Sequence, residues 1–341
     1  MRLLITTSVF HPRIGGIETV ARLLAREYHR QGHSVRILTT EPAGEPDRSQ
    51  FRVVRTRSPF TVWHQVQQAD AIIQLAGLRL GWSLLLLERN SLIVHQNWPG
   101  IPARGSSLTG RLRRHWISRC RNVCPSHAFQ RTAPFPCDVV GNPYDDEIFG
   151  RDGEPAPTKD IIFVGRMVPE KGPDLLLEAL AVLAKKGLFP TATLVGDGPL
   201  VASCREQVAS LGLKASVEIP GPAQGPALAR MLRQHHIMVV PSKWPEPFGI
   251  VALEGVACGC VVVGSSGGGL AEAMGPGGVT FETENASALA AVLEKVIDLP
   301  YVGPVKADSP AGLHLASHRP EFVARRYLEL LALHPLKYSN Q

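Results

Sequence analysis

Short apolar runs alternate with amphipathic segments along the first half of the chain. Residues 2–7 and 35–40 are apolar runs of strand length. Between them, apolar side chains recur at helical spacing from Ile17 to Tyr28, and Gly32 follows, which predicts a helix that ends at this glycine. A strand–helix–strand unit of this length predicts a right-handed parallel crossover.

The alternation continues towards the middle of the chain. Further strand-like runs occur at residues 71–75, 92–95, 121–125 and 138–141. Residues 41–68 show no clear period and are left unassigned. Residues 150–158 are rich in glycine, proline and charge, which predicts a linker.

After this linker the alternation starts again. We expect strands at residues 161–165, 192–196, 237–240 and 260–264, and helices at residues 174–186, 200–211, 250–257, 285–297 and 321–331. The pattern predicts an α/β protein of two doubly wound, Rossmann-like domains, residues 1–145 and 146–315. A C-terminal helix and tail, residues 316–341, can pack against either domain, and we expect the first.

The length of 341 residues suits two such domains. Ligands of open parallel sheets bind at the carboxyl ends of the strands, so we expect the site in a cleft between the domains. Neither a Gly-x-Gly-x-x-Gly after the first strand nor a P-loop sequence is present, which argues against a nicotinamide dehydrogenase and a P-loop enzyme.

The sequence shows neither a membrane-spanning segment nor a pattern of paired cysteines. No apolar run is long enough to span a bilayer, and the first seven residues are typical of a strand rather than of a signal peptide, so a cytoplasmic location is expected. The six cysteines form no Cys-x-x-Cys pair and show no zinc spacing. We expect them to be free thiols in a reducing compartment.

Basic charge is concentrated in the first half. Residues 1–150 carry 19 Arg, no Lys and 11 acids, a balance of +8, whereas residues 151–341 have a balance of −2. Either an anionic partner or a solvated basic surface explains this asymmetry. In residues 109–121, arginines such as Arg111, Arg113 and Arg114 alternate with Trp116 and other apolar side chains, which fits a basic helix on the inner face of an anionic membrane or a core-facing helix with a basic exterior. We expect no nucleic-acid partner.

The segment of residues 241–254 carries the strongest chemical pattern. It joins a buried strand to a helix, with Gly249 at the turn. Glu246 lies in the loop, where it can reach sugar hydroxyls, and Glu254 lies about a turn inside the helix, where it can accept from both hydroxyls of a ribose. Taken alone, both acids could be ordinary surface residues. The backbone around the helix start forms an anion site for a diphosphate, and its residues are Phe248, Gly249, Ile250 and Val251.

Several motifs, in order, resemble those of glycosyltransferase family 4, the retaining GT-B enzymes of the glycosyl transferases group 1. The resemblance covers most of the chain. In the second half, residues 246–254 are similar to the Glu-x7-Glu signature of the family, and residues 164–172 are similar to its Gly-Arg…Lys-Gly loop. Residues 195–199 resemble the end of the strand that follows in the family, and residues 266–272 resemble its Gly-Gly-x-x-Glu turn with one extra residue before the acid. In the first half, residues 12–19 resemble its first Gly-Gly loop, and residues 140–143 resemble its crossover between the domains.

This resemblance implies transfer of a sugar from a nucleotide diphosphate sugar to a hydroxyl acceptor with retained configuration. We expect a uridine diphosphate sugar as the donor because such donors are the most frequent in the family, and a guanosine diphosphate sugar is the alternative. The resemblance implies no metal or other cofactor. Arg166 and Lys171 would stabilise the charge that develops on the departing diphosphate. In the same-face displacement favoured for the family, that phosphate takes the acceptor proton, so Glu246 would bind the sugar and not attack it.

Other site residues follow from the same resemblance. His95, at the end of an expected strand, matches a histidine that contacts the donor sugar in many members, although a lone histidine is more often structural. Gly15 and Gly16 precede the first long helix, in a loop that the family places against the donor phosphates and the acceptor. Gly165 and Gly198 complete the expected donor-binding set.

Three alternatives to a glycosyltransferase are consistent with a two-domain fold of this kind. A GT-B epimerase or phosphorylase is less consistent with the Glu-x7-Glu context, and a phosphorylase needs a lysine-bound pyridoxal phosphate. A non-catalytic nucleotide-sugar sensor or subunit would bind the same ligand as an enzyme, and only a turnover measurement separates the two. The acceptor, which could be a glycan, a lipid or another anionic molecule, is not readable from these motifs.

Overall fold

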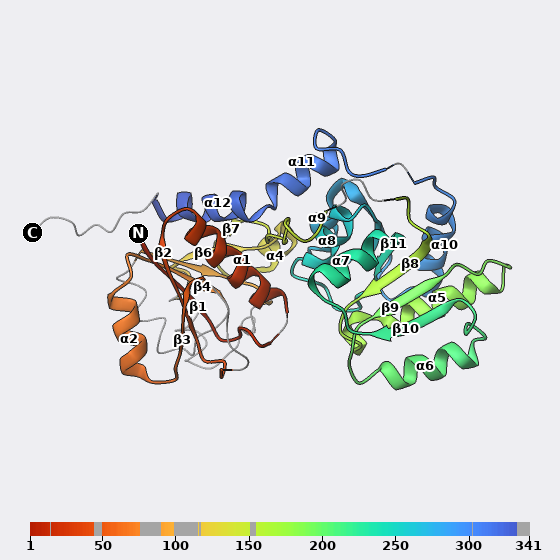
Figure 1. The fold of residues 1–341 in the computed structure, drawn as a ribbon, viewed down its shortest axis with the longest axis horizontal. Helices are drawn as coiled ribbons and strands as arrows, with labels where there is room; N and C mark the ends of the chain where they lie inside the picture. The colour runs from red at the N-terminus through yellow and green to blue at the C-terminus, as the bar shows by residue number, and fades with distance from the viewer. Residues whose placement is uncertain are drawn as a thin grey trace, which may run out of the picture. The chain divides into compact units, whose positions relative to one another are not determined.

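The structure is a computed structural model and describes residues 1–13, 15–43, 50–75, 90–98, 115, 117–150, 155–301 and 303–332. The chain forms two compact units (Figure 1). The first comprises Met1–Tyr144 together with the chain from His318 on, and the second comprises Asp145–Ser317. No helix in the described ranges is long and apolar enough to cross a membrane.

The first unit is built on a parallel sheet. Its described part has seven strands in the order β3-β2-β1-β4-β5-β6-β7. They are β1 (Arg2–Thr7), β2 (Ser34–Thr39), β3 (Arg52–Arg55), β4 (Ala71–Leu75), β5 (Ser91–Val94), β6 (Arg121–Cys124) and β7 (Asp138–Val139). The central strands β1 and β4 are buried along nearly their whole length, which explains why they appear in the sequence as continuous apolar runs.

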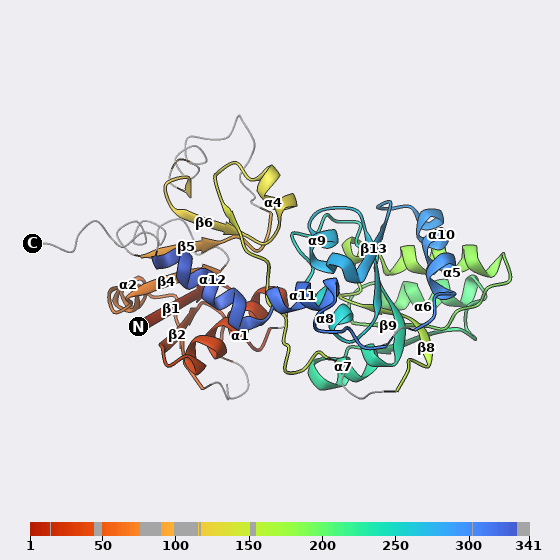
Figure 2. The ribbon, with the colours of Figure 1, turned by 90° about the horizontal axis from the view of Figure 1, so that it is seen from above.

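Helices pack on this sheet and on each other. They are α1 (Gly16–Arg30), α2 (Pro59–Gln67), α4 (His127–Thr132) and α12 (Pro320–Ala332). The Tyr28 hydroxyl of α1 donates to the backbone oxygen of Ala324 in α12 at 3.2 Å. The C-terminal helix therefore packs against α1 of the first unit, as both ribbon views show (Figures 1 and 2).

Strand β3 and helix α2 lie in the stretch that the sequence pattern left unassigned. Strand β3 reads Arg-Val-Val-Arg and forms an edge of the sheet. Helix α2 begins after Ser58, whose hydroxyl accepts from the Thr61 N–H at 3.5 Å, and proline occupies its first position. Its buried Val62 and Val66 pack on the sheet.

The second unit is also a parallel α/β sheet. Its described part has six strands in the order β10-β9-β8-β11-β12-β13. They are β8 (Lys159–Val164), β9 (Ala192–Val195), β10 (Val217–Gly221), β11 (His235–Val240), β12 (Val261–Ser265) and β13 (Gly278–Phe281). The helices are α5 (Pro173–Ala184), α6 (Val201–Ser210), α7 (Gly225–Arg233), α8 (Ile250–Ala257), α9 (Leu270–Met274), α10 (Ala286–Ile297) and α11 (Pro310–Ser317). The predicted α/β class of two Rossmann-like domains is confirmed, and α4, α7, α9, α11, β10 and β13 are additions to the sequence prediction.

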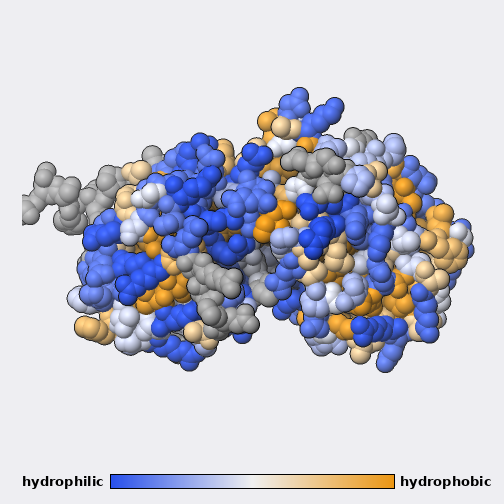
Figure 3. Space-filling model, in the orientation of Figure 1, coloured by the Kyte–Doolittle hydropathy of each residue, from blue (hydrophilic) through white to orange (hydrophobic). Residues whose placement is uncertain are grey.

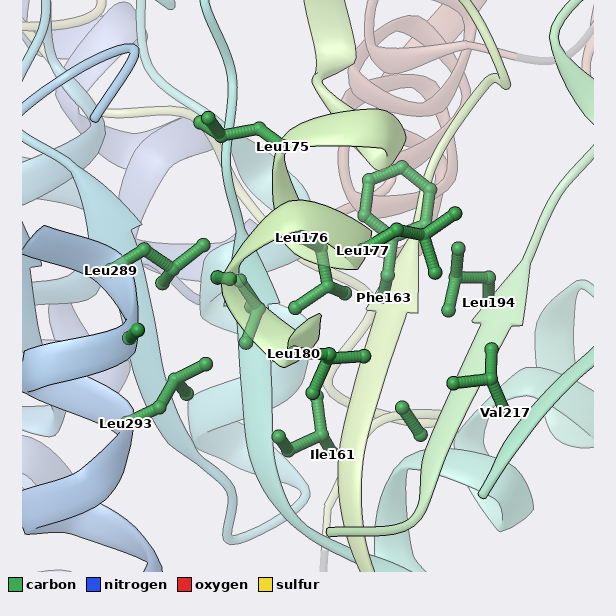
Figure 4. Packing of buried hydrophobic residues seen from close by; sticks show 14 of the residues in the cluster. Ile161, Phe163, Leu175, Leu176, Leu177, Leu180, Leu194, Val217, Leu289 and Leu293 are labelled. Carbon is green, nitrogen blue, oxygen red and sulfur yellow. The ribbon is translucent and has the colours of Figure 1, made fainter. Parts of the chain in front are cut away.

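A continuous apolar core fixes the strands of the second unit. Leu176 and Leu180 of α5 lie over Ile161 and Phe163 of β8, and α10 contributes further leucines such as Leu289 (Figure 4). Complete burial of a leucine side chain stabilises a fold by about 1.5–3 kcal/mol. This core holds the carboxyl ends of the strands, and hence the loops that follow them, in fixed positions.

Hydrophilic and hydrophobic residues both lie on the surface of each unit. On the face drawn in Figure 3, hydrophilic residues dominate both units and hydrophobic patches are smaller. Exposed large hydrophobic side chains include Phe60 and Trp63 in the first unit, and Phe189 and Trp244 in the second.

Candidate functional site

The predicted donor-binding residues of the second unit lie in loops at the carboxyl ends of its strands. Residues 165–172 follow β8, 196–198 follow β9, 241–249 follow β11 and 266–269 follow β12. Because the sheet order places β9, β8, β11 and β12 side by side, the four loops are neighbours along one edge.

The loops after β8 and β11 are joined through their backbones. The N–H groups of Lys243 and Trp244 both donate to the backbone oxygen of Glu170, at 3.0 and 3.3 Å. Gly172 adopts a φ of +65°, and a Cβ at this position would lie 2.2 Å from the backbone oxygen of Pro241. Only glycine permits both this conformation and this approach.

The loops after β11 and β12 are joined in the same way. The Gly269 N–H donates to the Glu246 backbone oxygen at 2.7 Å, and Glu246 also forms an isolated parallel bridge with Gly268. A Cβ on Gly268 would lie 2.2 Å from that Glu246 oxygen. The glycine turn therefore holds the backbone of the sugar-binding candidate.

Two donors orient the Glu246 carboxylate. Lys171 Nζ donates to Oε1 at 2.5 Å, and the Ser242 hydroxyl donates to the same oxygen at 2.7 Å. The side chains of Lys171 and Glu246 are 30% and 12% exposed, so the ion pair is largely shielded from solvent. Within the described residues nothing donates to Oε2, which leaves this oxygen as an acceptor for a ligand hydroxyl.

Arg166 differs from Lys171 in its surroundings. Its side chain is exposed in the turn after β8 and makes no hydrogen bond or ion pair in the part of the chain that the structure describes. The neighbouring Gly165 N–H donates to the Val195 oxygen at 3.1 Å, and the Gly198 N–H donates to Asp197 Oδ1 at 2.8 Å. Arg166 is thus an available cation on a loop that is held by β9.

Helix α8 begins in the middle of this loop cluster. Its N-cap is Gly249, and among described residues no side chain caps it and no acid lies in its first turn. The N–H groups of a first helical turn, here including Ile250 and Val251, lack intrahelical acceptors and attract anions. The Phe248 side chain is buried, so its ring is not presented to a ligand. Glu254 lies half-buried within α8.

In the first unit, the Gly15–Gly16 pair lies at the start of α1. Gly15 is the N-cap and Gly16 the first helical residue. Glu18 Oε2 lies 2.7 Å from the position that a Cβ on Gly15 would take. The start of α1, where we expected a donor phosphate, therefore already holds the carboxylate of Glu18. A negative charge at a helix start interacts favourably with the helix dipole.

His95 is held by an asparagine and two phenylalanines. Its Nε2 lies 3.0 Å from Asn122 Oδ1, and Asn122 Nδ2 donates to the backbone oxygens of Ile117 and Cys120 at 2.8 and 2.9 Å. These donations fix the amide orientation, so Nε2 carries the proton and donates to Oδ1. The imidazole also stacks on Phe135 at a centroid distance of 4.4 Å.

The structure thus brings one group of predicted residues together. Arg166, Lys171, Glu246 and the start of α8 lie on neighbouring loops of the second unit, whereas Gly15, Gly16 and His95 belong to the first unit.

The sequence pattern did not single out two residues that contact predicted ones. Ser242 donates to the same Glu246 oxygen as Lys171, and Asn122 pairs with His95. The predicted basic segment around Arg111, Arg113, Arg114 and Trp116 lies outside the described residues. Across the described ranges, no three His, Cys, Asp or Glu side chains could together hold a metal ion.

Comparisons with known proteins agree with these two units. A model of glycosyl transferases group 1 matches residues 145–308, and a model of the glycosyl transferase 4-like domain matches residues 15–143. D-inositol 3-phosphate glycosyltransferases from Jonesia denitrificans and Thermobispora bispora are 38% and 36% identical over 128 and 159 residues, which are 35% and 43% of this chain. The chain covers 30% and 37% of the lengths of these relatives.

Solved structures show the same fold. The Anabaena protein HepE, solved in complex with UDP, superimposes with a TM-score of 0.77 at 19% identity, covering 98% of this chain and 100% of HepE. A glycosyltransferase from Rickettsia africae superimposes with the same TM-score of 0.77 at 16% identity, covering 99% of each chain. The two adjacent family models and the shared two-domain architecture establish that the chain belongs to glycosyltransferase family 4, with the GT-B fold.

Proposed function

We propose that the chain is a retaining glycosyltransferase that moves a sugar from a nucleotide diphosphate sugar to a hydroxyl group of an acceptor. The Lys171–Glu246 pair carries this proposal. It holds a cation and an oriented carboxylate on loops adjacent to the start of α8, which no side chain of the described residues caps. A diphosphate needs the cation and the helix start, and a sugar needs the carboxylate.

The charges have separate tasks in the reaction. As the bond between sugar and diphosphate breaks, negative charge grows on the departing phosphate, and Lys171 and Arg166 stabilise it more in the transition state than in the ground state. Lys171 has three N–H donors, so it can keep its bond to Glu246 while it donates to a phosphate oxygen. With two cations present, we propose that the reaction needs no metal.

Binding of the donor would involve both acids. Glu246 Oε2 accepts from a sugar hydroxyl, and Glu254 accepts from the ribose. We propose that configuration is retained by the same-face displacement expected for the family, with the departing phosphate oxygen taking the acceptor proton. Neither acid attacks the sugar in this scheme, so the two-carboxylate logic of glycoside hydrolases does not apply.

We propose a uridine diphosphate sugar as donor, with a guanosine diphosphate sugar as the alternative. Support comes from HepE, which shares the fold and was solved with UDP and with UDP-glucose. For the acceptor we propose an anionic hydroxyl compound. The net charge of +8 over residues 1–150 favours such a partner, and the relatives named D-inositol 3-phosphate glycosyltransferase carry a phosphorylated compound in their name.

We further propose peripheral contact between the first unit and an anionic membrane surface. Helix α2 supports this proposal, because Phe60 and Trp63 are 75% and 45% exposed and lie one turn apart, at a ring centroid distance of 6.3 Å. The exposed Arg57 precedes them. An aromatic pair beside a cation suits the boundary between headgroups and acyl chains.

Sedimentation with vesicles tests the membrane contact. Wild-type protein should sediment with vesicles that contain phosphatidylglycerol more than with phosphatidylcholine alone, and the Phe60→Ser/Trp63→Ser variant should stay in solution. Phe189→Ser is the matched control, because Phe189 is 63% exposed on the second unit. Equal sedimentation of the wild type and the α2 variant would contradict the proposal.

Turnover with a panel of uridine and guanosine diphosphate sugars tests the enzymatic proposal. In the presence of a chelator and a phosphorylated polyol as acceptor, we expect nucleotide diphosphate release with one donor family and a product of unchanged anomeric configuration. Tight donor binding without transfer or hydrolysis of any donor would instead support a nucleotide-sugar sensor.

A further inference from the structure

Two cysteine thiols in the first unit lie in contact. Cys124 ends β6, and Cys137 directly precedes β7, which pairs with β6 in parallel. Their Sγ atoms are 3.0 Å apart, and neither cysteine takes part in a disulfide in this structure. A disulfide bond is about 2.05 Å long, so the two sulfurs need to approach by only ~1 Å.

The two thiols differ in accessibility. Cys124 is fully buried, with its Sγ 3.6 Å from the backbone oxygens of Ser126 and Asp138, whereas Cys137 is partly exposed. The hydrogen bond between the thiols lowers the pKa of Cys137 below its ordinary value. Burial has the opposite effect elsewhere and raises the pKa of Cys120 and of Cys204 to about 11. Since the thiolate is the nucleophile, Cys137 is more reactive than Cys120 or Cys204, and its partial exposure lets a reagent reach it.

We propose that Cys124 and Cys137 form a reversible disulfide by exchange with a low-molecular-weight disulfide such as oxidised glutathione. The Cys137 thiolate attacks one sulfur of the reagent, whose S–S bond breaks and releases one thiolate. Cys124 then attacks the Cys137 sulfur of the mixed disulfide, and the second glutathione leaves as the thiol because its departing sulfur takes the Cys124 proton. Two cysteines are oxidised and one glutathione disulfide is reduced to two thiols.

The segment between these cysteines packs on His95. It contains α4 and contributes Phe129 and Phe135, whose rings lie 6.0 and 4.4 Å from the imidazole. Phe129 also stacks on Trp98 at 5.0 Å. A disulfide would therefore close a covalent loop that contains both phenylalanines packed on His95. Formation of the bond is independent of whether the chain transfers a sugar.

Peptide mapping of the whole protein tests the disulfide. After native protein is treated with oxidised glutathione and then alkylated, trypsin separates the cysteines into residues 122–131 and 132–151. We expect these two peptides to be linked, with the link lost on reduction and the other four cysteines alkylated. Absence of the linked peptide, while glutathione is found on other cysteines, would overturn the proposal.

Variants separate this pair from nonspecific oxidation. Cys137→Ser should abolish the linked peptide, whereas Cys204→Ser should form it as the wild type does. The effect on His95 is read from its imidazole proton resonances, which should shift on oxidation of the wild type and not of Cys137→Ser. Linkage in urea-denatured protein but not in native protein would show that the folded geometry does not favour the bond and would contradict the inference.

Discussion

Lys171 Nζ lies 2.5 Å from Oε1 of Glu246, across two loops whose residues are 75 positions apart in the sequence. The sequence pattern assigned these residues to different tasks, one to the phosphate and one to the sugar. Their contact means that the charge of each is balanced before any donor arrives. Because the ammonium group has three donors, a bound phosphate can share it with Glu246 without breaking the pair.

Removal of the Lys171 amine should reduce turnover strongly. Loss of one electrostatic donor to a developing charge costs about 10²–10³ in rate, and we expect Lys171→Ala to fall in this range. The variant also leaves the partly buried Glu246 carboxylate with Ser242 as its remaining donor. Steady-state rates of nucleotide diphosphate release measure the effect. Lys185→Ala, which removes an exposed lysine after α5, should leave the rate unchanged.

Glu246→Gln should affect the sugar more than the nucleotide. The amide keeps the size of the side chain and can still accept from Lys171, but it binds a sugar hydroxyl less well by about 1.5–3 kcal/mol, the value of a hydrogen bond to a charged group. Calorimetric affinity for the donor sugar nucleotide should therefore drop by about 10- to 100-fold, while affinity for UDP changes little. An equal loss for both ligands would contradict the assigned role. Glu206→Gln, at an exposed position of α6, is the control.

Gly172→Ala should destabilise the second unit more than a matched glycine substitution. Gly172 and Gly212 have φ values of +65° and +72°, so alanine costs about 1–2 kcal/mol of backbone strain at either position. A Cβ on Gly212 meets nothing within 4 Å, whereas one on Gly172 meets the Pro241 oxygen at 2.2 Å. Urea denaturation should show the larger loss of unfolding free energy for Gly172→Ala. Equal losses would mean that the two loops separate easily.

Acidification should weaken the second unit through His235. The imidazole is buried, with Nδ1 donating to the Met231 oxygen at 2.6 Å and Nε2 at 2.9 Å from the Thr193 hydroxyl, and burial lowers its pKa. Since the unfolded chain then binds more protons, the unfolding free energy is highest above the ordinary histidine pKa of about 6.5 and declines as the pH falls through the lower folded value.

The variant His235→Gln should make this decline shallower in pH-dependent urea denaturation. It should not abolish the decline, because burial also lowers the pKa of His33 and of His236. His29→Gln, at an exposed position of α1, should leave the slope as in the wild type. An unchanged slope in His235→Gln would refute the assignment.

The buried strands could be predicted from sequence because both of their faces are covered. Strand β1 spans the expected residues 2–7, and Ala71–Leu75 was likewise expected in full. The edge strands β3 and β13 give no such signal. Strand β3 places arginine at both ends, and β13 carries two exposed residues within the four of Gly278–Phe281, so neither forms an apolar run. The short helix α9 spans too few residues to show a period.

For the site, the sequence indicated the loops but not their contacts. Gly172 and Gly268 can be read from the sequence, but the reason for each glycine is its close approach to a backbone oxygen, of Pro241 and of Glu246, in the loop after the neighbouring strand β11. Likewise, the pairing of His95 with Asn122 joins two strand ends that are 27 positions apart. Contacts of this kind are set by strand order, which the local pattern does not encode.

We expect the loops around the Lys171–Glu246 pair and the start of α8 to bind a nucleotide diphosphate. Isothermal titration of UDP into the full chain, compared with the Arg166→Ala/Lys171→Ala variant, measures this binding. We predict saturable binding of one UDP per chain, at least tenfold weaker in the variant, which corresponds to a loss of about 1.4 kcal/mol or more. Binding of UDP and GDP to neither protein, or with the same affinity to both proteins, would contradict the account.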